Sequence, residues 1–121
     1  MKRGDLYRVY KGNKNDQKDY RIYLVVSRQD VINNQFPTVI CAPVRTKYGG
    51  LTTQVEVGVD EGLKHDCAVY CEPQPSPKGE GSPLDDLFSL PKFILTNYIS
   101  HLSIIKMQEV NSALRIALAV E

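Results

Sequence analysis

The stretch Arg21-Ile22-Tyr23-Leu24-Val25-Val26-Ser27 decides how the rest of the sequence is interpreted. Residues 22–27 have the β-branched and aromatic content of a strand that is buried on both faces. Arg21 stands at the start of this strand, directly after a polar loop that has no apolar anchor before Tyr20. Because a buried strand is rigid, it holds in place whatever projects from its end. The sequence therefore predicts a scaffold that presents the Arg21 side chain at its edge.

Length and composition indicate a single domain, residues 1–121, with 42% hydrophobic and 24% charged residues. This is ordinary composition for a globular protein that needs neither disulfides nor a metal to bury a core. A formal net charge of +1 argues against bulk nonspecific nucleic-acid binding and leaves room for a local basic groove. No apolar run approaches the roughly 20 residues of a membrane span, and the basic start has no apolar segment of a signal peptide behind it. We therefore expect a cytoplasmic protein.

Three cysteines, Cys41, Cys67 and Cys71, are an odd number for a disulfide framework. Cys41 and Cys71 lie in strand-like apolar runs, so we expect all three to be buried thiols. Cys67 and Cys71 are four residues apart, a spacing that fits no common zinc-ligand pattern. We expect no metal site and no cofactor.

Several further segments have the pattern of short strands separated by turns. The expected strands are residues 5–10, 38–42, 52–57, 67–72 and 98–102. Residues 28–36 are expected to form an irregular turn or a short helix that ends at Pro37, and Pro43 is expected to end the second core strand. Residues 44–50 then form a loop with basic groups and a tyrosine. These elements predict a mainly β (α+β) fold, a small β-barrel.

One helix is expected at the C-terminus, residues 104–119, with Ser103 as its N-cap. Its main apolar stripe faces the barrel and consists of Met107, Val110, Leu114, Ala117 and Leu118. Ala113, Ile116 and Val120 widen the stripe and would stay exposed in a monomer, which predicts an interface between two copies of the chain. Between the strands and this helix, residues 73–86 contain four prolines and two glycines, so we expect a flexible insert, followed by a short helix that begins at Pro91.

Several short motifs follow one another along the chain. They are Arg3-Gly4-Asp5-Leu6-Tyr7, Arg21 with its strand to Ser27, residues 39–44, Thr53-Gln54-Val55, residues 62–66 and the ending from Leu102 to Leu118. The order of these motifs resembles that of the MazF/PemK family of toxins. The resemblance implies an SH3-like barrel that forms a homodimer and cleaves single-stranded RNA, including mRNA, without a metal. It also implies 2′,3′-cyclic phosphate and 5′-hydroxyl products, a cognate antitoxin, DNA binding by the complex with that antitoxin, and a bacterial cytoplasmic location.

The resemblance also implies site residues. Arg21 matches the catalytic arginine, with phosphate stabilisation as its role, although an arginine at a strand end can also serve a salt bridge. The family's second catalytic residue, a threonine or serine, is replaced by Arg45. Either Thr46 supplies the hydroxyl or Arg45 contributes charge, and an ordinary polar loop residue is the alternative for Thr46. Glu72 matches an acidic family position and is a candidate base, with a simple salt bridge as the alternative.

RNA contacts are expected in the loops before and after the strand that begins at Arg21. Where family loops tend to read Gly-Ser-Glu-Gln-x-Gly-x-Arg-Pro, residues 14–22 of this chain keep an acid and Gln17 but lose the glycine and the proline. The expected RNA-binding residues are Asn15, Asp16, Gln17, Lys18, Lys47 and Tyr48. Tyr48 is suited to stack on a base, and an ordinary loop tyrosine is the alternative. His65 and His101 match no catalytic position of the family, so we expect both to be bystanders.

Two other functions stay open at this point. The same barrel fold serves a toxin that binds DNA gyrase without nuclease activity, through its C-terminal helix and without need of Arg21. A degenerate member of the family, inactivated by the change at Arg45 and in the loop before Arg21, is the second alternative. Arg21 and the basic loop of residues 45–47 favour the nuclease.

Overall fold

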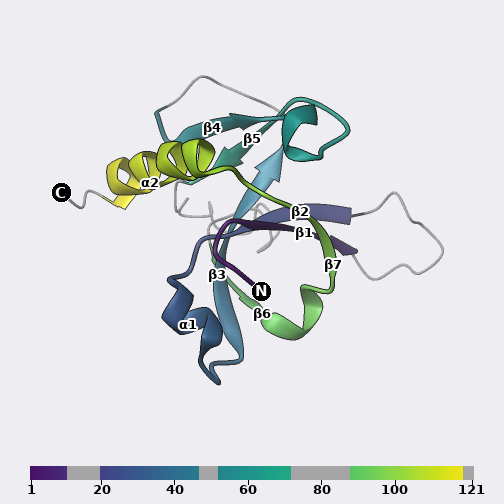
Figure 1. Cartoon of the computed structure of the whole chain (residues 1–121), viewed down its shortest axis with the longest axis vertical. Helices are drawn as coiled ribbons and strands as arrows, with labels where there is room; N and C mark the ends of the chain where they lie inside the picture. The colour runs from purple at the N-terminus through teal and green to yellow at the C-terminus, as the bar shows by residue number, and fades with distance from the viewer. Residues whose placement is uncertain (11–19, 47–51, 72–87, 119–121) are drawn as a thin grey trace, which may run out of the picture.

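The computed structural model describes residues 1–10, 20–46, 52–71 and 88–118 of the chain (Figure 1). The expected insert, residues 73–86, lies outside the described residues. The elements are β1 (Asp5–Tyr10), β2 (Tyr20–Val25), α1 (Gln29–Asn33), β3 (Thr38–Arg45), β4 (Gln54–Val57), the 3₁₀ turn η1 (Val59–Glu61), β5 (Cys67–Tyr70), β6 (Phe88–Pro91), the 3₁₀ turn η2 (Lys92–Ile94), β7 (Asn97–His101) and α2 (Ile104–Leu118).

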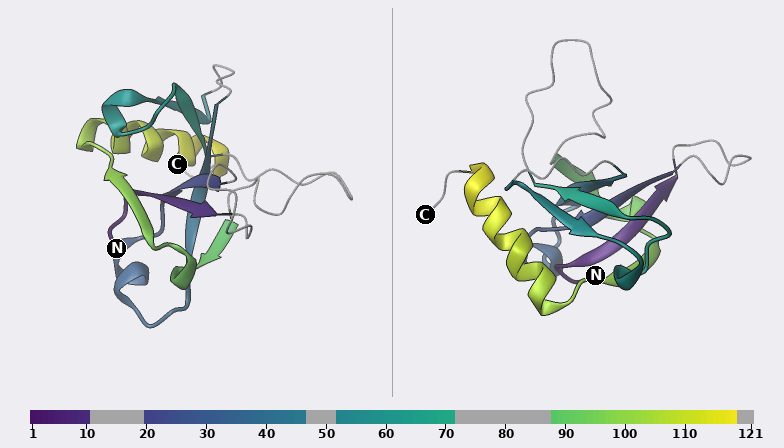
Figure 2. Two further views of the ribbon diagram at one scale, coloured as in Figure 1. Left: turned by 90° about the vertical axis from the view of Figure 1, so that its right-hand side faces the viewer. Right: turned by 90° about the horizontal axis from the view of Figure 1, so that it is seen from above.

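The strands form one antiparallel sheet in the order β4-β5-β3-β2-β1-β7, with β6 paired to the first half of β3. The sheet is strongly curled, as the views along and across it show (Figures 1 and 2). The C-terminal helix α2 packs against β4, on the side of the sheet away from α1. The expected fold class is confirmed: a mainly β, half-barrel sheet with one C-terminal helix.

Strand β2 is buried on both faces, as its sequence predicts. Leu24 belongs to the larger core, which lies between the sheet and α2. Tyr23 and Val25 point to the opposite face and belong to a second core that includes Ile32 of α1. All three β2 side chains have no exposed surface, and this double burial fixes the strand in the middle of the fold.

Strand β3 corrects one expectation, because it continues through Pro43 to Arg45. A proline has no backbone N–H, so in a central strand it removes one hydrogen bond to a neighbouring strand. On one side of β3 the pairing with β6 ends at Cys41 and the pairing with β5 begins at Val44. Pro43 therefore falls in the gap between two partner strands, where the missing donor costs little.

Strand β6 was not expected from the sequence. Its four residues, Phe88–Pro91, pair with Thr38–Cys41 of β3 and show too little alternation to be recognised alone. The short helical turn expected to begin at Pro91 is present as η2, which directly follows β6. Tertiary pairing, which local sequence does not reveal, makes this segment a strand.

Helix α2 begins where its cap predicts, since Ser103 Oγ accepts a hydrogen bond from the Lys106 backbone N–H at 3.2 Å. The expectation that Ala113 is exposed is wrong. Ala113 is 1% exposed and packs in the core with Met107 and Val110, because its small side chain fits where the helix lies close to the sheet. Leu118, expected to face the barrel, is 51% exposed, because the last turn of α2 runs beyond the core. Val120 lies outside the described residues.

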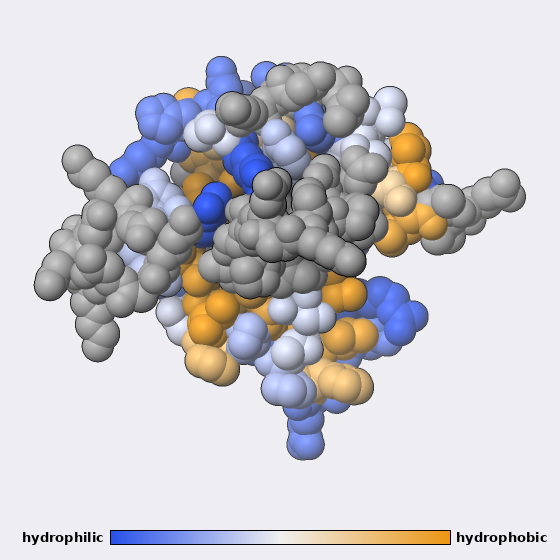
Figure 3. All heavy atoms as spheres, turned by 180° about the vertical axis from the view of Figure 1, so that it is seen from behind, coloured by the Kyte–Doolittle hydropathy of each residue, from blue (hydrophilic) through white to orange (hydrophobic). Residues whose placement is uncertain are grey.

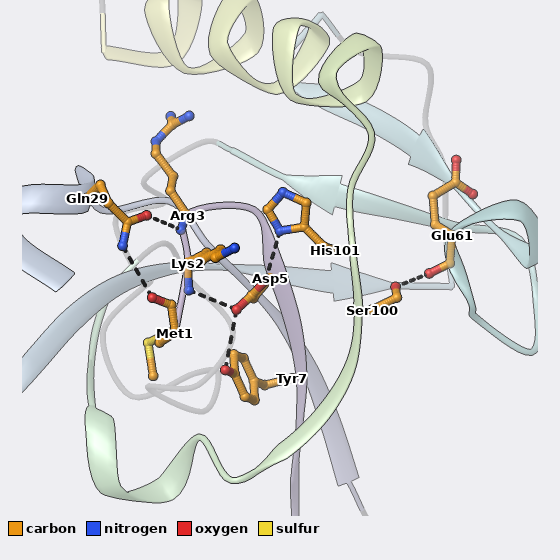
Figure 4. A network of polar contacts seen from close by, with 9 residues as sticks. All are labelled: Met1, Lys2, Arg3, Asp5, Tyr7, Gln29, Glu61, Ser100 and His101. Atoms are coloured by element: carbon orange, nitrogen blue, oxygen red, sulfur yellow. Dashed lines mark hydrogen bonds and ion pairs between the residues drawn. The ribbon is translucent and has the colours of Figure 1, made fainter. Parts of the chain in front are cut away.

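The opening motif Arg3-Gly4-Asp5 has a structural explanation (Figure 4). Asp5 is buried, and its carboxylate accepts hydrogen bonds from the Lys2 backbone N–H and from His101 Nδ1, both at 2.8 Å. Gly4 has a φ of 99°, in the region that favours glycine, and a Cβ there would lie 3.0 Å from His101 Cε1. A side chain at position 4 would therefore collide with His101, and glycine is required there.

Arg3 completes this arrangement from the other side. Its Nε donates to the Val26 carbonyl at 3.1 Å, and its Nη2 donates to Asn111 Oδ1 of α2 at 2.7 Å. Burial of the guanidinium lowers the pKa of Arg3. We call Arg3, Gly4, Asp5, His101 and Asn111 the N-terminal clasp, because they join β1, β7 and α2.

The three cysteines are free and buried, as expected. Burial raises the pKa of Cys41 and of Cys71 to about 12, so both remain protonated thiols. Among the described residues, no His, Cys, Asp or Glu side chains gather in a group of three or more that could hold a metal ion. No helix in the described part of the chain is long and apolar enough to cross a membrane.

Candidate active site

A cavity of about 450 Å³ opens at the end of the sheet where β3 ends and where β2 and β5 begin. We call it the arginine cavity. It is lined by Tyr20, Arg21, Ile22, Val44, Arg45, Thr46, Leu63, Lys64, His65, Cys67 and Tyr70. Its residues come from three neighbouring strands and from the loop between η1 and β5.

Strand register brings two arginines to this cavity. In the antiparallel pair of β2 and β3, Ile22 lies opposite Val44, so the residues next to them, Arg21 and Arg45, lie at the same edge. The buried part of β2 that follows Arg21 fixes its backbone. Arg21 itself is half-buried, between the core and the cavity. A half-buried guanidinium is suited to bind a phosphate, because it keeps its charge at neutral pH and offers several donors in a fixed plane.

Arg45 is the last residue of β3 and pairs in register with Ala68 of β5. Its guanidinium lies over the Tyr70 ring, 5.5 Å from the ring centroid. This contact orients the charge toward the cavity wall and keeps the tyrosine in place. Thr46 follows directly and is exposed at the cavity.

Tyr20, which directly precedes Arg21 in the sequence, also lines the cavity. The Arg8 guanidinium of β1 stacks over its ring at 4.6 Å, and Tyr10 contacts it edge to face at 5.9 Å between centroids. Two aromatic rings, Tyr20 and Tyr70, are thus each held by an arginine at the rim of the same cavity. Aromatic rings near cations are typical of sites that bind single-stranded nucleic acid.

The loop after η1 supplies the remaining wall. Gly62 has a φ of 86° and turns the chain, and the buried Leu63 fastens the loop to the core. Lys64 and His65 then reach the cavity before β5 begins at Cys67. Burial, and to a smaller extent the charge of Asp66, raises the pKa of Cys67, so this thiol is a poor nucleophile.

Among the sequence-predicted site residues, the structure brings Arg21, Arg45 and Thr46 together in one cavity. Their catalytic roles stay predictions. The other predicted site residues, Asn15, Asp16, Gln17, Lys18, Lys47, Tyr48 and Glu72, lie outside the described residues.

Sequence reasoning missed Tyr20, Lys64 and Tyr70, and it treated His65 as a bystander although it lines the cavity. A signal for Tyr20 was present, since it begins a strand directly before Arg21. Tyr70 has no basic neighbour in the sequence, and its contact with Arg45 depends on tertiary packing. The approach of the loop from Gly62 to Asp66 to the cavity depends on tertiary packing as well. His101 lies in the N-terminal clasp.

The described lining carries three basic side chains, Arg21, Arg45 and Lys64, and no carboxylate. Such a lining attracts a polyanion and stabilises extra negative charge on a phosphate. Threonine and histidine in the same wall add a hydroxyl and an imidazole. The arrangement is suited to chemistry at a phosphodiester next to unpaired bases.

Comparison with solved structures finds the same fold in bacterial toxins. An endoribonuclease in complex with its cognate antitoxin, from a mycobacterial species, is 22% identical, with a TM-score of 0.74 over 100% of this chain and 97% of that chain. The Mycobacterium tuberculosis toxin MazF-mt6 is 20% identical, with a TM-score of 0.72 over 97% and 98%. A MazE-MazF structure from Deinococcus radiodurans is 16% identical, with a TM-score of 0.69 over 100% and 97%. At these identities the likeness establishes a shared fold.

No curated protein matches the chain. The family described as PemK-like, MazF-like toxin of type II toxin-antitoxin system matches residues 2–74. This match includes β1 to β5 and therefore every described residue of the arginine cavity. Because it covers more than half of the chain, the protein belongs to the PemK-like, MazF-like toxins of type II toxin–antitoxin systems.

Proposed function

We propose that this protein is a toxin that cleaves single-stranded RNA, mRNA included, without a metal ion and thereby blocks translation. The observation that carries the proposal is the arginine cavity, in which Arg21 and Arg45 lie beside two aromatic rings. Two of the similar toxins described above are named endoribonucleases or toxins, which agrees with this activity.

The proposed reaction is an attack by the RNA on its own backbone. The 2′-oxygen gives up its proton and forms a bond to the adjacent phosphorus, while the bond from phosphorus to the 5′-oxygen breaks and that oxygen takes a proton. The products are a 2′,3′-cyclic phosphate and a 5′-hydroxyl. Negative charge grows on the phosphoryl oxygens in the transition state, and the Arg21 guanidinium would stabilise it there.

Arg45 stands where the family has a hydroxyl residue, and Thr46 follows one position later. We propose that Arg45 adds a second positive charge at the phosphate and that Thr46 contributes the hydroxyl from the end of the strand. The stacking of Arg45 on Tyr70 supports this assignment, because it holds the guanidinium at the cavity. Tyr70 and Tyr20 would then stack on bases that flank the cleaved bond.

The test is incubation of the purified protein with a pool of long RNAs in the presence of EDTA, followed by mapping of the cut ends. We expect cuts at one short sequence in unpaired RNA, with 5′-hydroxyl ends. Uncut RNA at micromolar protein would contradict the nuclease and leave the two alternatives, a gyrase-directed toxin and a degenerate member. Relaxation of supercoiled DNA by gyrase, with and without the protein, would separate those two.

A cognate antitoxin is the proposed protein partner, since one similar toxin is described in complex with its own. Single-stranded RNA enters through a basic, aromatic opening, so an antitoxin segment that covers this opening would block cleavage. The proposed place of action is the bacterial cytoplasm, where mRNA is translated.

We also propose that the toxin is a homodimer. An apolar groove of about 720 Å³ runs between α1, the first half of β3 and the end of α2, with Val31, Phe36, Ile40, Leu114 and Leu118 among its lining residues. Phe36, Ile40 and Leu118 are large apolar side chains that are 58%, 45% and 51% exposed. The rear view shows hydrophobic surface gathered on this side of the molecule (Figure 3). A second copy of the chain would remove this surface from water.

Light scattering at micromolar concentration tests the assembly. We expect a mass of two chains for the wild type, a lower mass for Leu118→Asp in the groove, and no change for Glu109→Ala on the exposed side of α2. A two-fold interface repeats each contact, so the single charge acts twice. A wild-type mass of one chain would contradict the dimer.

A further inference from the structure

His65 lies in a loop whose two ends are fixed. On one side, the buried Leu63 donates its backbone N–H to the Gly58 carbonyl at 3.2 Å. On the other side, the Cys67 thiol donates to the His65 carbonyl at 3.4 Å, and Cys67 itself pairs with Val57 in the sheet. The backbone of His65 is therefore held at the wall of the arginine cavity, with the residue exposed to whatever occupies the cavity.

The proposed cleavage needs a group that accepts the 2′-hydroxyl proton near neutral pH. As residue types, arginine, lysine and tyrosine are poor bases for this purpose, because they ordinarily keep their protons near neutral pH. Burial raises the pKa of the Cys67 thiol further from neutrality. Imidazole is the side chain that ordinarily changes charge between about pH 5 and 8. In the described lining of the cavity, which contains no carboxylate, His65 is the one imidazole.

We propose that His65 is the general base of RNA cleavage in this protein, an inference that rests on the proposed function. The neutral imidazole takes the proton of the 2′-hydroxyl as the 2′-oxygen bonds to phosphorus. The bond from phosphorus to the 5′-oxygen then breaks, and the 5′-oxygen takes a proton from water in the open cavity. The imidazolium returns its proton to solvent when the products leave.

The surroundings of His65 suit this role. The charged and titratable groups that face the same cavity are Tyr20 and Arg21 of β2, Arg45 of β3, Cys67 and Tyr70 of β5, and Lys64 of its own loop, with Asp66 next to His65 in the chain. The cations bind the phosphate and leave the imidazole to work on the neighbouring hydroxyl. Histidine and arginine thus divide the two tasks that metal-free cleavage requires, proton transfer and charge stabilisation.

Glu72 is the competing base, and paired variants separate the two. With His65 as the base, His65→Gln loses more of the cleavage rate in EDTA than Glu72→Gln does. With Glu72 as the base, the order is reversed.

The experiment compares single-turnover cleavage by the wild type, His65→Gln and Glu72→Gln on one mapped RNA. We expect His65→Gln to lower the rate by about 10²- to 10⁴-fold, and to lower it more than Glu72→Gln does. Its affinity for the same RNA with a 2′-deoxy nucleotide at the cut should stay within about threefold of wild type, because the charges that bind phosphate remain. Added imidazole should partly restore cleavage by His65→Gly, which a merely structural role would not allow.

His101→Gln is the matched control, since it changes the only other histidine of the chain and lies in the N-terminal clasp. Its cleavage rate should equal that of the wild type. Wild-type cleavage by folded His65→Gln would overturn the inference while the proposed function stands. A cleavage rate that falls further in Glu72→Gln than in His65→Gln would likewise overturn it. Failure of the wild type to cut any RNA would instead overturn the proposed function, and this inference with it.

Discussion

The N-terminal clasp and the arginine cavity use the same residue types for different ends. In the clasp, Arg3 donates to Val26 and Asn111, and His101 donates to the buried Asp5 carboxylate. In the cavity, Arg21, Arg45 and His65 line a space of about 450 Å³. The clasp directs its charges at one another and at the backbone, whereas the charged side chains of the cavity surround a volume large enough for a nucleotide phosphate and a base.

The difference shows what a charged residue in a short motif means. Arg3-Gly4-Asp5 stands among the residues that resemble the toxin family, and its role in the structure is to join β1, β7 and α2. Removing a clasp residue should therefore change stability and leave chemistry alone, while removing a cavity residue should do the opposite. The following variants test this separation.

Arg21→Ala should have the largest effect. Loss of one donor to the transition-state phosphate lowers the cleavage rate by about two orders of magnitude or more, while the melting temperature stays within a few degrees of wild type. Single-turnover kinetics in EDTA and thermal circular dichroism measure the two quantities on the same sample. A folded variant that cuts as fast as wild type would remove Arg21 from the site.

Arg45→Ala and Thr46→Ala should each slow cleavage by about tenfold or more, with Arg45→Ala the more severe because it also frees Tyr70. The same kinetic assay checks both variants side by side. Normal rates in both would show that the second catalytic element lies elsewhere in the chain.

Asp5→Ala should lower stability and leave the cleavage rate unchanged, the reverse of the cavity variants. It leaves the Lys2 N–H and His101 Nδ1 without their acceptor and so lowers the free energy of unfolding by about 2–3 kcal/mol. For a chain of this size that is a fall in melting temperature of roughly 10 °C. Below the transition, the cleavage rate per folded molecule should equal that of wild type. If Asp5→Ala lost RNA cleavage while its melting temperature stayed that of the wild type, the clasp would belong to the active site.

Tyr7→Phe should have the smallest effect, visible in alkali. Burial, and then the neighbouring Asp5 carboxylate, raises the pKa of Tyr7. The unfolded chain therefore gives up this phenolic proton before the folded chain does, so the Tyr7 contribution to stability is present below about pH 10 and is lost as the pH rises further. Melting curves from pH 8 to 11 should fall less steeply for Tyr7→Phe than for wild type. Parallel curves would mean that folding does not raise the pKa of Tyr7.

Much of the fold follows from local pattern. The apolar run from Ile22 to Ser27 predicts a doubly buried strand, and Ser103 predicts the start of α2. Local sequence wrongly predicts that Pro43 ends its strand. The strand tolerates this proline because Pro43 lies in a gap between β5 and β6, and only the assembled sheet creates that gap. Local sequence also wrongly predicts that Ala113 is exposed, since the distance between helix and sheet decides whether a small side chain is buried.

The candidate site is less accessible from sequence. Arg21 and Arg45 can be brought together by assuming antiparallel neighbours, and the family resemblance picks out both. His65 reaches the same cavity from a loop about twenty residues beyond Arg45, held by Leu63 and by the turn at Gly62. No periodicity predicts where such a loop lies, so its histidine could not be separated from His101 by sequence alone.

The most direct measurement of the separation between clasp and cavity is a two-dimensional NMR titration with RNA that carries a 2′-deoxy nucleotide at the cut. Backbone amide shifts should move at Arg21, Arg45, His65 and Tyr70, and stay in place at Gly4, Asp5 and His101. Shifts concentrated at Asp5 and His101, with Arg21 and Arg45 unmoved, would contradict the assignment of the arginine cavity as the place where this toxin binds RNA.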